Sequence, residues 1–383
     1  MRFAIDAHAI GQHLTGNEVY IRNLLHEFTT LDRASEFIAY ISTPEAVGEL
    51  PPALKTRRVS ANPYVRLGWQ MSARLRRDKP ALLHVQYTAP ISCPVPLVVS
   101  VHDVSFLEHP KFFSPARVFQ LRQTVSRTIA QAARVLTPSE FSRSSIERHY
   151  PQARGKTVVV HNAVSPRFRH GNREQARARM KARFGIDAPF LLNVGDLQSR
   201  KNQVGLIGAF ENLIRLHPHL PHHLVLAGQD KWDAPAVRQA AAKSVLANRI
   251  HLAGYVSDDE LHMLYYACEV FVFPSFYEGF GIPILEAMAC GCAVACSNLS
   301  AMPEVADGAA IFFDPRVESE MTRAIRDLVM DAELRARMQR LGLQRAAAFS
   351  WERAARSSLE VYYEIAGASS RADGPAKSLR AAR

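Results

Sequence analysis

The sequence feature that most constrains the fold is a repeat of short, unbroken apolar runs, each followed by a longer stretch with helical periodicity. Such runs are typical of strands in a parallel sheet, because helices cover both faces of the sheet. Six runs lie in the first half of the chain: residues 3–5, 37–41, 82–85, 97–101, 135–137 and 158–160. Six more lie in the second half: residues 190–194, 224–227, 250–253, 270–273, 293–296 and 311–313. The two series predict an α/β fold of two doubly wound, Rossmann-like domains.

The length of 383 residues fits two domains, each large enough to bury its own core. The content of 48% hydrophobic and 22% charged residues excludes disorder as the main state. The chain contains no apolar stretch long enough to span a membrane, and Met1 leads directly into a strand-like segment. We therefore predict a cytoplasmic protein that neither spans a membrane nor is secreted.

We predict five segments along the chain. A first domain covers residues 1–170, a connector 171–189, a second domain 190–350, a helix 351–366 and a basic tail 367–383. Ser350 is a plausible N-cap for the helix, and Gly367 is expected to end it. The tail lacks apolar periodicity, which predicts disorder, and a functional basic tail is the alternative.

Positive charge is concentrated in the first half and the connector. The net charge is +8 over residues 1–165, +6 over 166–183, −6 over 184–366 and +3 in the tail. Residues 55–79 hold eight basic side chains against one acid, Asp78. This charge fits either solvated surface arginines or attraction to an anionic acceptor or membrane surface. Nucleic acid is not expected as a partner, because no basic-aromatic binding module accompanies the charge.

The five cysteines predict reduced thiols rather than disulfides, because their number is odd and no secretion signal is present. Cys290, Cys292 and Cys296 lie in or at the end of an apolar run without a neighbouring histidine. We interpret them as small buried side chains, so no metal site is predicted there. No D-x-D carboxylate pair marks a metal site for a sugar nucleotide.

Two adjacent cations precede the first helix of the second domain. The strand 190–194 ends at Gly195, and Arg200-Lys201-Asn202 stands directly before a helix that begins near Gln203. The helix dipole disfavours each cation at this end by about 0.3 to 1 kcal/mol unless an anion binds there. A diphosphate would reverse that sign and could accept hydrogen bonds from the helix amides, guanidinium and ammonium groups. The alternative is a pair of surface side chains.

A second constellation covers residues 275–288 and directly follows the strand 270–273. Pro283 suits the first turn of a helix, so Glu286 is expected on that helix and Glu278 in the loop before it. Carboxylates accept paired hydrogen bonds from neighbouring hydroxyls, such as the diol of a ribose or hexose. Taken alone, Glu286 could also be a first-turn acid that the helix dipole favours.

Glycines and a histidine complete the set of candidate residues. Gly279 and Gly281 would let the backbone approach a ligand and leave its amides free to donate. His102 follows the strand 97–101 and so lies at the carboxyl end of a parallel strand, where open sheets bind ligands. A purely structural hydrogen-bonding role is the alternative for His102. Residues 11–16 have a phosphate-loop-like glycine spacing without its Gly-Lys-Ser end, which argues against a nucleoside triphosphatase.

The segment from Glu278 to Glu286 is similar to the E-x7-E signature of retaining glycosyltransferases of family four, which have the GT-B fold. Arg200-Lys201-Asn202 resembles their diphosphate-binding turn, His102-Asp103 their strand-end His-Asp, and Thr15-Gly16 with Tyr20 their first loop. The resemblance covers residues 1 to about 366 and looks most like bacterial mannosyl- and deoxyhexosyl-transferases of surface polysaccharide assembly. It implies parallel sheets that face a central cleft, with the acceptor in the first domain and the nucleotide sugar in the second.

The resemblance also implies roles for single residues. Arg200 and Lys201 would hold the donor diphosphate, Glu278 would contact the transferred sugar, and Glu286 would bind the ribose. The segment Gly279, Phe280 and Gly281 would contact sugar or phosphate, His102 would lie beside the donor sugar, and Gly16 would leave room for the phosphates. Many relatives have a second glycine in the first loop where this chain has Glu18, which could instead face the acceptor.

The predicted function is retaining transfer of a hexose, mannose or a related deoxyhexose, to a glycan or lipid-linked glycan in polysaccharide or lipopolysaccharide synthesis. The resemblance implies no metal and no cofactor, and a GDP-sugar donor in preference to a UDP-sugar. The basic segment leads us to expect peripheral attachment at the inner face of the cell membrane. The alternatives are a sugar-nucleotide epimerase on the same fold and a non-catalytic nucleotide-sugar-binding partner.

Overall fold

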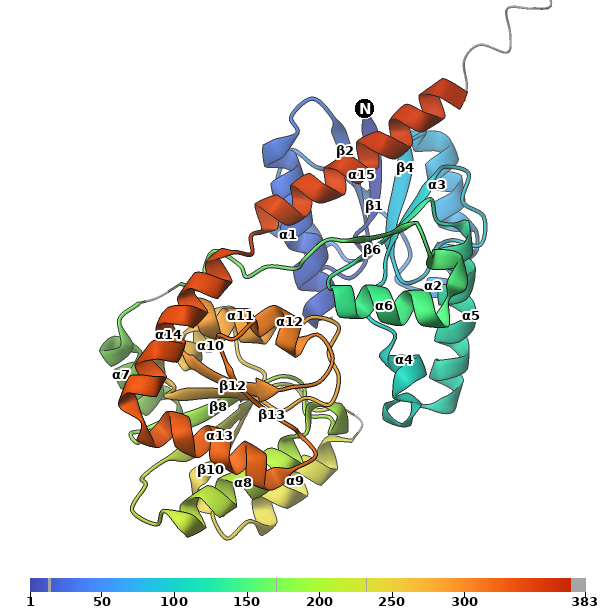
Figure 1. Ribbon diagram of the computed structural model, residues 1–383. Coiled ribbons are helices and arrows are strands. Elements are labelled where there is room, and N and C mark those ends of the chain that lie inside the picture. The colour runs from blue at the N-terminus through green and yellow to red at the C-terminus, as the bar shows by residue number, and fades with distance from the viewer. Residues whose placement is uncertain (13–14, 170, 232, 373–383) are drawn as a thin grey trace, which may run out of the picture. The chain divides into compact units, whose positions relative to one another are not determined.

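The computed structural model describes residues 1–12, 15–169, 171–231 and 233–372. These residues form two compact units (Figure 1). Unit 1 contains Met1–Asn162 and the chain from Trp351 onward, and unit 2 contains Ala163–Ser350. The units therefore divide before residue 170, at which the sequence predicts the end of the first domain.

Unit 1 is built on a seven-stranded parallel sheet with the order β3-β2-β1-β4-β5-β6-β7. Its strands are β1 (Arg2–Asp6), β2 (Glu36–Ile41), β3 (Lys55–Arg58), β4 (Leu82–Gln86), β5 (Leu97–Ser100), β6 (Arg134–Thr137) and β7 (Thr157–Val159). Its helices are α1 (Thr15–Leu31), α2 (Pro63–Val65), α3 (Met71–Asp78), α4 (Ser105–Glu108), α5 (Pro115–Gln131), α6 (Glu140–His149) and α15 (Trp351–Ala372). A π-helical turn (Arg66–Gln70) joins α2 to α3, and short 3₁₀ turns cover Glu45–Glu49, Pro110–Phe112 and Pro151–Ala153.

Unit 2 has a six-stranded parallel sheet with the order β10-β9-β8-β11-β12-β13. Its strands are β8 (Phe190–Val194), β9 (His223–Ala227), β10 (Ile250–Gly254), β11 (Val270–Phe273), β12 (Ala293–Ser297) and β13 (Ile311–Phe313). Its helices are α7 (Arg173–Phe184), α8 (Gln203–Leu216), α9 (Ala234–Lys243), α10 (Asp258–Ala267), α11 (Ile282–Ala289), α12 (Met302–Ala306), α13 (Glu318–Met330) and α14 (Ala332–Ala347). Two 3₁₀ turns cover Ser199–Lys201 and Ala247–Arg249.

The unit 2 sheet is buried on both faces, as its unbroken apolar strands predict. Leu192 and Phe271 enter one core, whereas their neighbours Leu191 and Val272 enter the core on the opposite face. This division follows from the alternation of side chains along a strand. The predicted fold class is confirmed, and a strand forms at each of the twelve apolar runs.

Strand β3 is an addition to the predicted set. Its sequence Lys-Thr-Arg-Arg has no apolar residue, and it lies at the edge of the unit 1 sheet beside β2. Edge strands tolerate charged side chains because one side of the strand faces solvent, and such charges also protect the edge from pairing with other chains. An apolar-run search therefore cannot detect this strand.

Two predicted segments differ in the structure. The connector 171–189 contains α7, whose Ala176 and Met180 enter a core of unit 2, so this segment belongs to that unit. Helix α15 continues past Gly367 to Ala372. A glycine costs a helix only about 1 kcal/mol, so it does not by itself end one. Residues 373–383 of the predicted tail lie outside the described residues.

Helix α15 packs within unit 1 through a fully buried tyrosine. Tyr362 has its ring 5.3 Å from that of Phe3 and 5.5 Å from that of Phe28, measured between centroids. Phe3 is on β1 and Phe28 is on α1, so the last helix joins the core that the first strand and helix begin (Figure 1).

Candidate functional site

The two cations before α8 meet Glu278 at the carboxyl ends of β8 and β11. Lys201 Nζ lies 2.7 Å from Glu278 Oε1, and Arg200 Nη1 lies 3.1 Å from the same oxygen. Arg200 also donates a hydrogen bond to the carbonyl of Tyr277, and its own carbonyl accepts from the Phe276 amide at 2.9 Å. The structure thus brings three sequence-predicted residues together around one carboxylate oxygen.

Burial makes this cluster electrostatically strong. The Lys201 side chain is 11% exposed and that of Glu278 is 12% exposed. Burial lowers the pKa of Lys201, although Glu278 opposes this change. Burial by itself would raise the pKa of Glu278, but the charges of Arg200 and Lys201 prevail and lower it to about 2. The cluster therefore brings two cations to one carboxylate oxygen, and Asp196 adds a weaker attraction to Lys201.

The space for Lys201 comes from a glycine and an aromatic ring. The ammonium lies 5.0 Å from the ring centroid of Phe273, a distance at which a cation–π attraction operates. Gly195 adopts φ +148°, and a Cβ atom there would lie 3.2 Å from Lys201 Cε. A side chain at position 195 would therefore press against the lysine stem.

The loop between β11 and α11 is held by a side chain from outside the loop and by the packing of Phe280. The Glu278 amide donates to Ser300 Oγ at 2.9 Å, which fixes the start of the loop. Gly281 precedes α11 with φ +103°, a conformation that L-residues rarely adopt. Phe280 is 4% exposed and packs on Phe349 with ring centroids 5.7 Å apart, so its side chain serves the core. Gly279 precedes Phe280 in the same loop between β11 and α11.

Glu286 lies on α11 beyond the first turn, so its position does not fit the alternative of a dipole-favoured first-turn acid. It is 8% exposed, and Tyr265 on α10 donates a hydrogen bond to Oε2 at 2.9 Å. Burial raises the pKa of Glu286 to about 7, while the Tyr265 hydroxyl opposes this rise. Glu278 and Glu286 therefore carry different protonation tendencies at neutral pH.

In unit 1, His102 lies just after β5 among aromatic rings. Its Nε2 lies 2.9 Å from Gln86 Oε1, and its ring centroid is 4.6 Å from Tyr20 and 5.7 Å from Tyr87. Burial lowers the pKa of His102 to about 4, with Asp103 opposing, so the ring is neutral at pH 7. A neutral imidazole has one nitrogen that donates and one that accepts.

Glu18 forms a hydrogen bond within the first loop of unit 1. Glu18 is 7% exposed and accepts a hydrogen bond from the Gly11 amide at 3.0 Å, where Gly11 has φ +76°. Its Oε1 thus faces the loop. Gly16 is exposed in the first turn of α1, and a Cβ atom there would meet no atom within 4 Å. Residues 13 and 14 of this loop lie outside the described residues.

Several polar contacts of the site were not anticipated from the sequence. Tyr265 on Glu286 and Ser300 on the Glu278 amide carry no recognisable signal, because neither lies at a strand end or in a motif. Gln86, in contrast, is the last residue of β4 and follows an apolar run. The position that drew attention to His102 would also have indicated Gln86.

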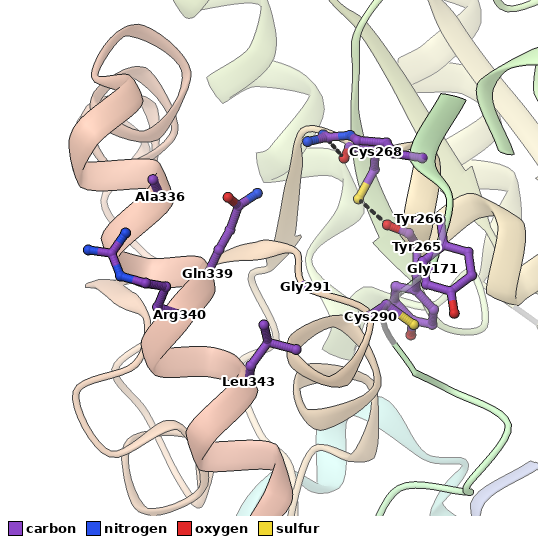
Figure 2. A pocket seen from close by; sticks show the side chains of 11 residues that line it. Gly171, Tyr265, Tyr266, Cys268, Cys290, Gly291, Ala336, Gln339, Arg340 and Leu343 are labelled. Carbon is purple, nitrogen blue, oxygen red and sulfur yellow. Dashed lines mark hydrogen bonds between the residues drawn. The ribbon is translucent and has the colours of Figure 1, made fainter. Parts of the chain in front are cut away.

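All five cysteines are free thiols, and Cys268, Cys290, Cys292 and Cys296 are buried. Unit 2 contains a cavity of about 300 Å³, and its lining includes Cys268, Cys290, Tyr265 and residues of α14 (Figure 2). The Cys268 thiol donates to the Tyr265 carbonyl at 3.3 Å, and burial raises the pKa of Cys290, which keeps that thiol protonated. Among the described residues, no group of three or more His, Cys, Asp or Glu side chains is placed to hold a metal ion.

Two doubly wound units, each with a parallel sheet and polar side chains at the strand ends, define the GT-B class of fold. Residues 14–168 match the family described as Glycosyltransferase Family 4, and residues 175–345 match Glycosyl transferases group 1. O-antigen chain mannosyltransferase B of Escherichia coli is 31% identical over 265 residues, which are 69% of this chain and 69% of that protein. The chain belongs to the glycosyltransferases of family four.

Solved structures agree on the fold. Sucrose-phosphate synthase from Thermosynechococcus elongatus superposes with a TM-score of 0.78 at 18% identity and covers 96% of this chain and 100% of that one. The Anabaena protein HepE, solved in complex with UDP and glucose, gives 0.72 at 17% identity and covers 95% of this chain and 99% of that one. Among the residues that the structure describes, no helix is long and apolar enough to cross a membrane.

Proposed function

We propose that the protein transfers a hexose, mannose or a related deoxyhexose, from a nucleoside-diphosphate sugar to a glycan or lipid-linked glycan, with retention of anomeric configuration and without a metal. The observation that carries the proposal is the buried cluster of Arg200, Lys201 and Glu278. The relation to an O-antigen chain mannosyltransferase supports mannose and lipopolysaccharide assembly in particular.

The donor diphosphate would bind at the cations of the cluster. Arg200 and Lys201 share one oxygen of Glu278, so a diphosphate would supply the negative charge that a single carboxylate does not. As the sugar departs, charge develops on the diphosphate, and fixed cations in a buried site stabilise that charge strongly. Two protein cations at this position would stabilise the negative charge of the leaving diphosphate, as a metal ion does in other transferases.

Glu286 would bind the ribose of the donor. Tyr265 occupies Oε2, and the structure shows no hydrogen-bond partner for Oε1 among the described residues. A carboxylate oxygen accepts from hydroxyls, so bound ribose would favour the ionised form of Glu286. Glu278, held by the two cations, would contact the transferred sugar, and the amides of residues 279–281 would contact sugar or phosphate.

His102 would orient the donor sugar or assist proton movement, and the neutral ring suits both roles. We propose guanine as the donor base in preference to uracil. HepE was solved with UDP, but it shares only the fold with this chain, at 17% identity, so its ligand does not determine the base here. A thermal-shift panel with GDP-, UDP- and ADP-sugars tests the base. A larger shift with UDP-sugars would overturn the guanine proposal without affecting the diphosphate site.

The decisive experiment incubates the protein with GDP-mannose and a lipid-linked glycan acceptor and analyses the product by mass spectrometry and NMR. The proposal expects the acceptor to gain a hexose with the anomeric configuration of the donor. A parallel incubation without acceptor should leave the donor sugar unchanged in stereochemistry. An isomerised donor would instead support an epimerase, and tight donor binding without any transfer would support a binding protein.

The basic face of unit 1 would hold the protein at an anionic membrane surface. Trp69, Arg76 and Arg77 are exposed along the π-helical turn and α3, and the two arginines follow Trp69 by seven and eight residues, about two helical turns. Each basic residue near such a surface adds about 1 kcal/mol, and tryptophan favours the lipid–water interface. Vesicle co-sedimentation at low and high salt tests this; equal binding to neutral and anionic vesicles would exclude it.

A further inference from the structure

The side chains behind His102 form a buried polar network. Gln86 and Ser100 are the last residues of β4 and β5 and pair in register. Gln86 is 6% exposed and lies with Oε1 2.9 Å from His102 Nε2. Ser100 Oγ lies 2.7 Å from the hydroxyl of Tyr20, whose ring packs edge-on against His102. The network reaches His102 from two strands and one helix of the same unit.

The backbone beside Gln86 is strained. Tyr87 adopts φ +57°, in the left-handed region that bulky residues avoid, and the Thr88 amide donates to the Gln86 carbonyl at 2.6 Å across it. A three-residue turn with positive φ at its centre is rare and costs free energy. This turn presents the Tyr87 ring to His102 at 5.7 Å between centroids. Strain that is retained at a strand end, next to a candidate ligand-binding histidine, indicates that the position of these side chains matters for function.

The hydrogen bond from His102 to Gln86 determines where the imidazole proton lies. An amide oxygen only accepts, so a ring nitrogen that faces Gln86 Oε1 must carry a hydrogen. The proton is then on Nε2, and Nδ1 of the neutral ring has a lone pair. The structure shows no hydrogen-bond partner for Nδ1 among the described residues. Nδ1 is therefore the nitrogen left for a ligand.

We propose that Gln86 is a positioning residue that holds His102 in the Nε2–H tautomer, so that Nδ1 accepts a hydrogen bond from a hydroxyl of the transferred sugar. The identity of the ligand rests on the proposed function, whereas the tautomer does not. In the present amide orientation, Gln86 Nε2 is buried without a partner among the described residues. The opposite orientation would turn Nε2 toward the ring and force the Nδ1–H tautomer, and the experiment separates the two.

Substitutions of Gln86 distinguish positioning from packing. Gln86→Glu keeps an acceptor opposite His102 Nε2, whereas Gln86→Leu keeps the volume and removes the acceptor. The new carboxylate should also raise the His102 pKa. The other groups that face His102 are Asp103, which favours its protonation, and His84, whose own pKa is lowered by burial and by His102. The rings of Tyr20 and Tyr87 also face it.

The test uses the full-length chain labelled with ¹⁵N-histidine and records long-range ¹H–¹⁵N correlation spectra, with the His102 signals assigned by their loss in His102→Asn. Wild type and Gln86→Glu should show the Nε2–H pattern, with a higher His102 pKa in the glutamate variant. Gln86→Leu should lose the single tautomer. An Nδ1–H pattern in the wild type, or an unchanged Nε2–H pattern in Gln86→Leu, would overturn the proposal.

Transfer kinetics add a second readout. Gln86→Leu should lower kcat about tenfold with less effect on donor binding, because one oriented hydrogen bond is lost. In Gln86→Glu the acidic limb of the pH–rate profile should move to higher pH and activity should recover above it. A packing role predicts the reverse order, with leucine better tolerated than a buried charge. Tyr362→Phe is the control: the Tyr362 hydroxyl lies 2.5 Å from His84 Nδ1, and His84 Nε2 lies 2.7 Å from Ser100 Oγ, so it reaches the network only through His84. This variant should leave the His102 tautomer unchanged. Transfer failure with the predicted tautomer intact would reject the proposed function alone.

Discussion

Replacing Lys201 by methionine separates its role toward Glu278 from its role toward a donor. The drop in the Glu278 pKa from 4.5 to about 2 corresponds to about 3 kcal/mol, since one pKa unit is worth about 1.4 kcal/mol. Arg200 remains 3.1 Å from the same oxygen, so Lys201→Met should remove about half of that contribution. The removal of a buried ammonium recovers some desolvation free energy, and the net loss at pH 7 should stay below about 2 kcal/mol.

The pH dependence of this loss has a defined sign. The pKa of Glu278 in the folded state lies below its unfolded value, so its contribution is present above about pH 4.5 and disappears as the pH falls toward 2. Urea unfolding of the wild type should therefore show stability falling over this window. In Lys201→Met the pKa of Glu278 should be higher in the folded state, so the decrease should begin at the same pH but be smaller and end nearer to pH 4.5.

Donor binding should respond more strongly than stability. A hydrogen bond to a charged group is worth about 1.5 to 3 kcal/mol, so the donor Kd should rise about 10- to 100-fold in Lys201→Met. The kcat should also fall, because the negative charge on the diphosphate grows in the transition state. Lys181→Ala is the control: its pair with Asp187 has 62% and 71% exposed side chains, and such pairs contribute about 0 to 1 kcal/mol. Unchanged donor Kd and kcat, with the acid unfolding displaced as expected, would show that Lys201 serves only Glu278 and would refute the diphosphate assignment.

Three further predictions concern Glu286, Gly281 and Tyr362. Burial raises the pKa of Glu286 to about 7, so nucleoside-diphosphate affinity measured by calorimetry should increase from pH 6 to pH 8 in the wild type and stay flat in Glu286→Gln. Gly281→Ala places a Cβ at φ +103° and should lower the free energy of unfolding by about 1 to 2 kcal/mol in urea titrations, whereas Gly48→Ala, which meets open space, should not. Tyr362→Phe removes the hydroxyl 2.5 Å from His84 Nδ1 in a fully buried site, and the orphaned nitrogen should lower the unfolding free energy by about 1 to 3 kcal/mol.

The strands were predictable because parallel-sheet burial leaves a direct mark on the sequence. The β11 segment Val-Phe-Val-Phe is buried at every position, and no polar residue interrupts it. The charged strand β3 lies at an edge where burial imposes no such pattern. Helix ends are less constrained: Gly367 predicts the end of α15, but one glycine costs a helix only about 1 kcal/mol, and α15 continues to Ala372.

The site was predictable in its parts and not in their connections. The residues Arg200, Lys201 and Glu278 each lie at a strand end, but the shared oxygen joins Glu278 to Lys201, 77 residues away, and to the neighbouring Arg200, which no local pattern specifies. The bond from Tyr265 to Glu286 likewise depends on how α10 packs beside α11. Contacts of this kind follow from packing of whole elements, so they require coordinates.

Many polar residues lie at the carboxyl ends of parallel strands, and not all of them bind a ligand. The hydrogen bonds that their side-chain atoms already make within the protein distinguish one residue from another. Asp6 ends β1 as a buried carboxylate, yet His8 Nδ1 lies 2.9 Å from Oδ1 and Arg66 Nε lies 3.8 Å from Oδ2. Both oxygens therefore face groups of the protein itself. His102 lies at an equivalent edge, and among the described residues only its Nε2 shows a side-chain hydrogen bond, which is why we propose Nδ1 as the atom that meets a ligand. Sequence position identifies which side chains reach the binding edge, whereas a functional assignment needs an atom that the fold leaves without a partner.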